Sequence, residues 1–323
     1  MTKPDPRKSF WSALKASDIA KVDWANIDWK QSTEGLREQF ESASHAMEPD
    51  LPHMAEISNL IIDGGSGPIN ARYYVPLGAG IGPAPGIVFF HGGGFVLGDV
   101  ASYDTFCRRL AAAARCRVIS VDYRLAPEHK FPSAHDDASA AWRWVVANAA
   151  MLSLDTERLA VAGDSAGGNL SAYICQDMKR TKGPLPAFQL LLYPLVQFAD
   201  IRAKKLSLQE GGFFISPSLF EYYRDSYIAD PGDRMDRRVS PLFAPDEDFR
   251  GLPPAHILLC GWDPLKHEGQ AYADKLAAQG VSVTVKTYSD MVHGFMNMTG
   301  VLGKARRAIA DAGDLVGREL GAR

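Results

Sequence analysis

From residue 86 onward, short apolar runs alternate with segments whose apolar residues recur every three or four positions. Continuous apolar runs are typical of strands buried on both faces of a parallel sheet, and the periodic segments are typical of helices with one packed face. The runs predict strands at 86–90, 118–121, 159–162, 188–193, 256–260 and 281–288. The periodic segments predict helices at 103–114, 133–149, 167–179, 265–279 and 302–320. This alternation predicts an α/β fold with a mostly parallel sheet and helices on both faces.

The region before residue 86 has two other patterns. Residues 1–50 are amphipathic with helical spacing, first at Phe10, Trp11 and Leu14 and later at Leu36, Phe40 and Ala43. The β-branched and aromatic runs 57–63 and 69–75 are separated by glycines, which predicts an antiparallel pair joined by a tight turn.

One segment interrupts the alternation. Residues 197–236 carry glycines and many aromatic residues but no clear strand pattern. Because they lie between two predicted core strands, we expect a helical insertion over one edge of the sheet. The predicted sheet then has eight strands.

Composition excludes several classes of protein. The chain has 323 residues with 46% hydrophobic and 23% charged, which excludes a disordered or fibrous protein. A net charge of −3 without a basic stripe gives no indication of nucleic-acid binding. Polar residues follow the basic N-terminus where a signal peptide would need an apolar run, and no stretch reaches the ~18 apolar residues of a membrane span. The four cysteines lie far apart, so we expect a reduced, cytoplasmic setting.

The strongest chemical motif is Gly163-Asp164-Ser165-Ala166-Gly167, which matches G-x-S-x-G between a predicted strand and a predicted helix. In that setting a sharp turn lifts the serine hydroxyl clear of the sheet, and the flanking glycines avoid clashes at the turn. Ser165 is therefore the candidate nucleophile.

A second motif, His91-Gly92-Gly93-Gly94, follows the predicted strand 86–90. Consecutive glycines leave backbone N–H groups open to a bound oxyanion, and with the N–H of Ala166 they would form an oxyanion hole. A phosphate loop is disfavoured because Phe95-Val96-Leu97 follows instead of Gly-Lys-Ser/Thr. His91 itself is expected to be a structural hydrogen-bonding residue.

A serine nucleophile needs a base, and the base needs an acid to orient it. His293 lies in the loop after the last predicted strand, where open α/β sheets place ligand-facing residues. Asp263 directly follows the strand 256–260, although it could also cap a helix that starts at Pro264. Glu268 and Asp290 are weaker rivals for the acid.

A cluster of His129, His135, Asp136 and Asp137 could suggest a metal site. Ser133 followed by Asp136 is more simply interpreted as a capping box that opens the helix 133–149. We therefore expect no metal, and no sequence motif indicates a cofactor.

Together these motifs resemble those of the bacterial hormone-sensitive-lipase-like esterases of the α/β-hydrolase superfamily, in the branch whose serine motif is Gly-Asp-Ser-Ala-Gly. The resemblance covers about residue 50 to the end. It also rests on 122–128 (DYRLAPE), Tyr193-Pro194, Asp263-Pro264-Leu265 and His293-Gly294-Phe295.

The resemblance implies an α/β-hydrolase fold, with Ser165 as nucleophile, Asp263 as acid and His293 as base. It places the oxyanion hole on Gly93, Gly94 and Ala166, with Gly92 in the same turn. It also implies a core of residues 51–196 and 237–323 under a helical cap made of 1–50 and 197–236. A homodimer through the last predicted strand, from Val281 to Tyr288, is expected as well. One departure is His267, where the family usually has an acidic residue.

The expected function is a serine carboxylesterase that acts on small apolar esters with short acyl chains. Aromatic residues of the cap segments agree with an apolar ligand: Trp11, Trp24, Phe213, Phe214 and Tyr222. The same triad would also serve an amide or carbamate hydrolase or an acetyl-ester deacetylase. A non-catalytic small-molecule receptor is the alternative from another class, which the presence of His293 disfavours.

Overall fold

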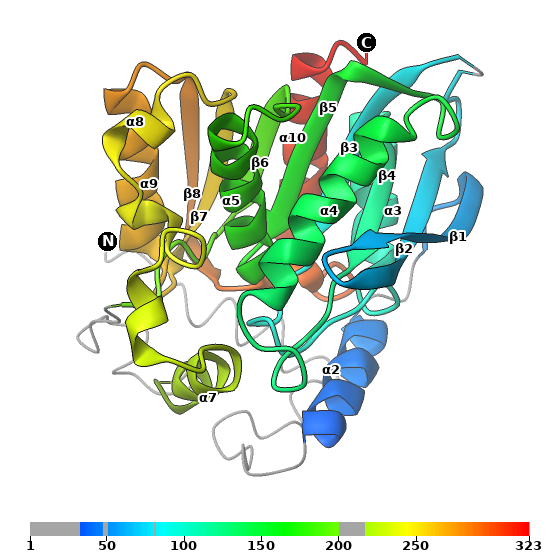
Figure 1. Ribbon diagram of the computed structural model, residues 1–323. Helices are drawn as coiled ribbons and strands as arrows, with labels where there is room; N and C mark the ends of the chain where they lie inside the picture. The colour runs from blue at the N-terminus through cyan, green and yellow to red at the C-terminus, as the bar shows by residue number, and fades with distance from the viewer. Residues whose placement is uncertain (1–32, 48–50, 81, 200–216, 323) are drawn as a thin grey trace, which may run out of the picture.

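In the computed structural model, which describes residues 33–47, 51–80, 82–199 and 217–322, eight strands form a single sheet (Figure 1). Their order across the sheet is β1-β2-β4-β3-β5-β6-β7-β8. The strands are β1 (Met54–Gly64), β2 (Gly67–Pro76), β3 (Ala84–Phe90), β4 (Arg117–Asp122), β5 (Leu154–Asp164), β6 (Phe188–Leu192), β7 (Ala255–Trp262) and β8 (Val283–Val292).

Only the first part of the sheet is antiparallel. β1 pairs with β2 through a hairpin in which Gly64 faces Gly67, and β2 pairs antiparallel with β4. The strands from β4 to β8 in the sheet order are all parallel. The predicted eight-stranded, mostly parallel sheet is confirmed, as is the antiparallel pair before residue 86.

Helices cover both faces of the sheet (Figure 1). α3 (Asp104–Ala114) and α10 (Gly303–Glu319) pack on one face, against side chains such as Phe89. α4 (Ser133–Ala147), α5 (Ala166–Arg180) and α9 (Lys266–Ala278) pack on the other, against side chains such as Phe90. Neighbouring residues of β3 therefore enter different cores, because side chains alternate across a strand.

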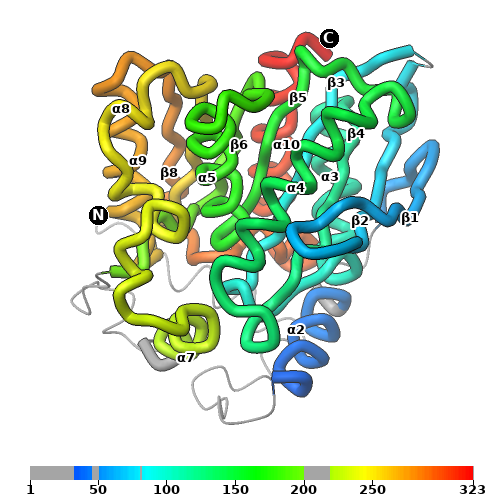
Figure 2. The backbone as a smooth tube through the Cα atoms, viewed as in Figure 1, coloured from blue at the N-terminus to red at the C-terminus, as the bar shows by residue number. Residues whose placement is uncertain are grey.

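Two further helices, α2 (Thr33–Met47) and α7 (Pro217–Tyr227), lie together beyond one end of the sheet (Figures 1 and 2). A hydrogen bond of 3.0 Å joins Thr33 Oγ1 of α2 to Tyr222 Oη of α7. α2 confirms the helical spacing at residues 36–43, and α7 confirms a helix in the insertion. Several other residues named for these segments lie outside the described residues: Phe10, Trp11, Leu14, Trp24, Phe213 and Phe214.

Short helices complete the described chain: η2 (Pro231–Met235), η3 (Pro241–Phe243), α8 (Asp246–Phe249) and η4 (Phe295–Asn297). Across the described ranges, no helix has both the length and the apolar character that a membrane crossing requires.

Several predicted boundaries were wrong. β5 starts at Leu154, five residues earlier than predicted, and β8 runs from Val283 to Val292. The capping box at Ser133 was also wrong, because Ser133 is already helical. Pro132 holds the N-cap position of α4 and no side chain caps the helix.

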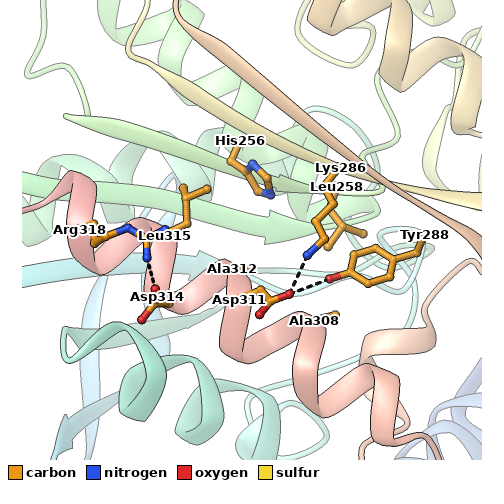
Figure 3. A pocket seen from close by; sticks show the side chains of 10 residues that line it. All are labelled: His256, Leu258, Lys286, Tyr288, Ala308, Asp311, Ala312, Asp314, Leu315 and Arg318. Atoms are coloured by element: carbon orange, nitrogen blue, oxygen red, sulfur yellow. Dashed lines mark hydrogen bonds and ion pairs between the residues drawn. The ribbon is translucent and has the colours of Figure 1, made fainter.

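A groove of about 310 Å³ lies between helix α10 and the last two strands of the sheet, β7 and the edge strand β8 (Figure 3). Lys286 Nζ lies 2.6 Å from Asp311 Oδ2, and Arg318 pairs with Asp314, so the charges in the groove are paired with one another. Buried His256 also lines it, with Nδ1 2.7 Å from Thr284 Oγ1. None of its lining residues belongs to the predicted catalytic motifs.

Burial and the nearby Lys286 lower the pKa of His256 to about 4, against about 6.5 in an unfolded chain. The folded protein therefore keeps His256 neutral while the unfolded chain gains a proton, so stability is lost as pH falls from about 6.5 towards 4. Between pH 7.5 and pH 5 this residue should account for about 2 kcal/mol of the lost unfolding free energy.

Urea unfolding of His256→Gln at the two pH values should show a smaller loss than the wild type by about that amount. His267→Gln, at an exposed position of α9, is the matched control and should lose as much as the wild type. Equal losses in all three proteins would contradict this assignment.

Candidate active site

Ser165 lies in the tight turn between β5 and α5. Its φ of +53° and ψ of −115° form a strained conformation for a residue with a side chain. A Cβ at Gly163 would lie 2.3 Å from backbone atoms of Gly167, and one at Gly167 would lie 1.8 Å from Phe90 O. Only glycine fits at both positions, so the turn packs tightly enough to direct the serine away from the sheet.

The predicted nucleophile, base and acid come together at the carboxyl ends of their strands. Ser165 follows β5, Asp263 follows β7 and His293 follows β8. His293 Nε2 lies 2.9 Å from Ser165 Oγ, and His293 Nδ1 lies 2.8 Å from Asp263 Oδ2. Three residues far apart in the sequence thus form one continuous chain of hydrogen bonds.

The partners of His293 define its tautomer. An ionised carboxylate only accepts hydrogen bonds, so Nδ1 donates to Asp263 and Nε2 is left to accept from the Ser165 hydroxyl. The Asp263 side chain is 1% exposed and that of His293 is 9% exposed. The Tyr193 ring packs edge-on against the imidazole at 4.9 Å between ring centroids. The imidazole is therefore held with Nε2 facing the Ser165 hydroxyl.

The expectation that Asp263 could cap a helix that starts at Pro264 was wrong, but Asp263 does have a structural role in the turn before that helix. Its Oδ1 accepts a hydrogen bond of 2.8 Å from the Leu265 N–H while Oδ2 faces His293. α9 begins at Lys266, two residues after Pro264, with Leu265 at the N-cap position. One carboxylate thus shapes the turn before α9 and orients the histidine.

The rival acids have other partners. Glu268 Oε2 accepts from Gln197 Nε2 at 2.9 Å, and Asp290 pairs with Lys304. His267, where the family usually has an acidic residue, lies on the exposed side of α9. Its substitution therefore does not reach the Asp263–His293 contact.

The glycine loop after β3 is shaped by left-handed backbone conformations. The φ angles of Gly93 and Gly94 are +108° and +63°, and Gly93 O accepts from the N–H groups of Val96 and Leu97 at 3.1 and 2.9 Å. Across the described residues, the N–H groups of Gly93 and Gly94 have no backbone partner. Ala166 is the first residue of α5, so its N–H has no partner within the helix either.

Gly92 has a different role from its neighbours. Its N–H donates to Asp164 Oδ1 at 2.7 Å and lies 3.1 Å from Tyr103 Oη. An N–H that is bonded inward cannot also bind an oxyanion. Among the three glycines, Gly92 therefore anchors the loop, while Gly93 and Gly94 keep N–H groups without a backbone partner among the described residues.

The remaining histidines near the motifs are structural. His91 Nδ1 lies 2.7 Å from Gly92 O, and its ring stacks on Tyr123 at 4.3 Å. His135 Nδ1 lies 2.7 Å from Tyr227 Oη and its Nε2 lies 3.0 Å from Asn169 Oδ1. Asp137 binds Arg124 at 2.8 Å. No group of three or more His, Cys, Asp or Glu side chains in the described ranges could hold a metal ion.

Helix α7 lies directly on the glycine loop. A Cβ at Gly94 would lie 2.4 Å from Tyr223 Cγ, so the Tyr223 ring covers this glycine. One turn later, the Tyr227 ring stacks on Phe95 at 4.2 Å with an angle of 6° between the ring planes. Tyr223 could not be identified from the sequence, because an aromatic residue in an insertion carries no motif that distinguishes it.

Helix α2 reaches the same loop through Arg37. Its Nε donates to Val96 O at 2.9 Å and its Nη2 to Ala126 O at 2.8 Å, while both Nη groups bind the Glu128 carboxylate at 3.0 and 2.8 Å. A guanidinium suits such planar, multiple contacts. Arg37 therefore ties α2 to the segments that follow β3 and β4.

Comparisons with known proteins agree with this geometry. A family model described as alpha/beta hydrolase fold matches residues 87–297. The chain belongs to the α/β-hydrolase fold family. It is 39% identical to a carboxylic ester hydrolase, LipN, of Mycobacterium tuberculosis, over 88% of this chain and 75% of that protein. It is 35% identical to an ethyl acetate hydrolase of Pseudomonas putida, over 83% of this chain and 85% of that protein.

Solved structures of this family include similar esterases. An ester hydrolase from the metagenome of Lake Arreo, complexed with a derivative of bipyridine phosphonate, superposes with a TM-score of 0.89 at 38% identity, over 99% of this chain and 100% of that one. A thermostable esterase from Pseudomonas putida has a TM-score of 0.89 at 30% identity, over 99% of both chains. The predicted fold and the resemblance to α/β-hydrolase esterases are confirmed.

Proposed function

We propose that this α/β-hydrolase is a serine carboxylesterase of the hormone-sensitive-lipase-like branch. Ser165 is its nucleophile, His293 its base and Asp263 its orienting acid, and the N–H groups of Gly93, Gly94 and Ala166 form its oxyanion hole. The observation that carries the proposal is the unbroken contact from Ser165 through His293 to Asp263. The names of the esterase relatives support the same activity.

The reaction follows from the tautomer of His293. Nε2 takes the Ser165 proton as Oγ attacks the ester carbonyl, and Asp263 stabilises the imidazolium that forms. The imidazolium then gives its proton to the leaving alcohol, and an acyl-enzyme remains on Ser165. Water, deprotonated by the same nitrogen, releases the acid and restores the free serine.

The N–H groups of the proposed oxyanion hole would stabilise the negative charge that develops on the carbonyl oxygen. The N–H of Ala166 stands at the N-terminus of the 15-residue helix α5, where the helix dipole favours an anion. Donors of this kind are already in place before the reaction, and losing one typically costs about 10²–10³ in kcat.

We further propose that residues 1–50 and 197–236 form a cap over a catalytic core of 51–196 and 237–323. Contacts of α2 and α7 with the segments after β3 and β4 support this division. Tyr223 brings a large ring onto Gly94, which limits the space beside the oxyanion hole. A limited space favours small apolar esters with short acyl chains.

The presence of His293 disfavours the alternative function, a small-molecule receptor without catalytic activity. A fold reused only for binding has no need of a histidine held between a serine and a carboxylate, as His293 is. The amide, carbamate and deacetylase alternatives use the same residues, and no contact in the described chain favours them over ester hydrolysis.

Two proposals concern the setting of the enzyme. All four cysteines are buried and free, which supports a reduced, cytoplasmic location.

β8 is an edge strand of the sheet and carries exposed Val285, which supports a homodimer through this edge. The molar mass in solution tests it, since a monomer that persists at high concentration would exclude the dimer.

Ser165→Ala should keep the fold and reduce the hydrolysis of a short nitrophenyl ester by at least about 10⁴-fold in kcat, because it removes the hydroxyl that forms the acyl-enzyme. A nitrophenyl phosphonate should label the wild type at one equivalent per chain and leave the variant unlabelled. Substantial turnover by the variant would overturn the assignment of the nucleophile, and a wild type that neither turns over esters nor takes the label would overturn the esterase.

Tyr223→Ala should shift the preferred acyl chain of nitrophenyl esters towards longer chains, because it removes the ring that covers Gly94. The measurement is kcat/KM across a series from two to twelve acyl carbons. Tyr222→Ala, on the same helix but bonded to Thr33 of α2, is the matched control and should keep the wild-type preference. A profile that shifts equally in both variants would show that loosening of the cap, not the Tyr223 ring, sets chain length.

A further inference from the structure

Three segments of the site meet at the buried carboxylate of Asp164, next to the nucleophile. Its Oδ1 accepts the Gly92 N–H at 2.7 Å. Its Oδ2 accepts from Tyr103 Oη at 3.1 Å and from Asn297 Nδ2 at 3.4 Å. Gly92 belongs to the glycine loop after β3, and Asn297 belongs to the turn that follows His293. Tyr103 lies at the start of α3.

The donors around Asp164 also bind one another. Tyr103 Oη lies 3.1 Å from the Gly92 nitrogen and 3.2 Å from Asn297 Nδ2. There is no room for a side chain in this junction, since a Cβ at Gly92 would lie 2.7 Å from Asp164 Oδ2 and 2.9 Å from Tyr103 Oη. The Asp164 carboxylate therefore fixes the distance between the glycine loop and the turn that carries Ser165.

Burial of a carboxylate is costly, because desolvation penalises its charge and hydrogen-bond donors must offset that cost. A neutral amide at this position would offer an acceptor to the Gly92 N–H without that cost. We propose that Asp164 is a positioning residue for ester hydrolysis: its carboxylate holds the Gly93 and Gly94 donors, the Ser165 hydroxyl and the His293 loop in one fixed arrangement. This inference rests on the proposed esterase activity and adds a residue to it.

The ionisation of Asp164 falls close to neutral pH. Burial raises the pKa of Asp164 to about 6, against the opposing effects of Tyr103, His293, Gly92 and Asn297. Burial also raises the pKa values of the other ionisable groups around it, so they stay neutral near pH 7: Tyr103, Tyr123, Tyr193 and Cys107. Asp164 is then the group of this junction whose charge changes close to neutral pH.

Asp164→Asn tests the proposal with little change in shape. The amide oxygen can still accept the Gly92 N–H, but the charge that strengthens this bond is lost. We expect kcat for a short nitrophenyl ester to fall at least tenfold while KM stays within about threefold, because substrate binding does not depend on the carboxylate. The acid limb of the kcat/KM profile should move to lower pH, because the variant has no carboxyl group that titrates near pH 6 at this position.

Tyr103→Phe is the second variant, since it keeps the carboxylate and removes the hydroxyl that contacts both Asp164 and the Gly92 nitrogen. A smaller fall in kcat, again with KM nearly unchanged, is expected. Tyr73→Phe is its matched control: Tyr73 Oη donates to Leu152 O at 2.6 Å in a contact outside the site, so its kcat should equal that of the wild type.

Phosphonate labelling separates this proposal from the esterase assignment. Both variants should still take one equivalent on Ser165, more slowly than the wild type. A kcat and an acid limb identical to those of the wild type in folded Asp164→Asn would overturn the positioning role and leave the esterase intact. If Asp164→Asn does not fold, wild-type kcat in Tyr103→Phe would overturn it equally.

Discussion

The close approach of the serine turn to the end of β3 is the constraint on which the site depends. Gly167 packs so tightly on Phe90 O that a Cβ there would lie 1.8 Å from the oxygen. That contact holds Ser165 at a φ of +53°, a strain of roughly 1–3 kcal/mol that the surrounding sheet must offset. Because β3 also leads into the glycine loop, the same contact brings the Ser165 turn towards Gly93 and Gly94. The parallel register of β3, β5, β7 and β8 then brings Asp263 and His293 to the same edge.

Tertiary contacts beyond the sheet act on the glycine loop from several sides. Asp164 accepts a hydrogen bond from the Gly92 N–H, whereas the Tyr223 ring of α7 covers Gly94. Arg37 of α2 binds Val96 O just after it. In the proposed enzyme, the segment that stabilises the transition state is thus also the surface on which the cap rests. A change in the cap would therefore alter both the space for the acyl chain and the geometry of the oxyanion donors.

Much of this arrangement could be predicted from the sequence. Continuous apolar runs and alternating helices indicated the parallel sheet, and the order Ser165, Asp263, His293 placed each residue after a strand. These signals are local, so a single sequence carries them. The partner of the Gly92 N–H is set by the fold, because Asp164 is 72 positions away, and three adjacent glycines look equivalent until that contact is known. Ser133 was mistaken for a cap because the start of α4 depends on the turn at Pro132. Tyr223 could not be distinguished from the other aromatic residues of the insertion.

The most direct test of the account is a crystal structure of the enzyme with a short alkyl phosphonate bound to Ser165. We expect a covalent bond to Ser165 Oγ, with the phosphoryl oxygen about 3 Å from the nitrogens of Gly93, Gly94 and Ala166. We also expect that the Gly92 N–H remains on Asp164 and that His293 stays bonded to Asp263. A phosphoryl oxygen bound by Gly92, or directed away from the glycine loop, would contradict this expectation.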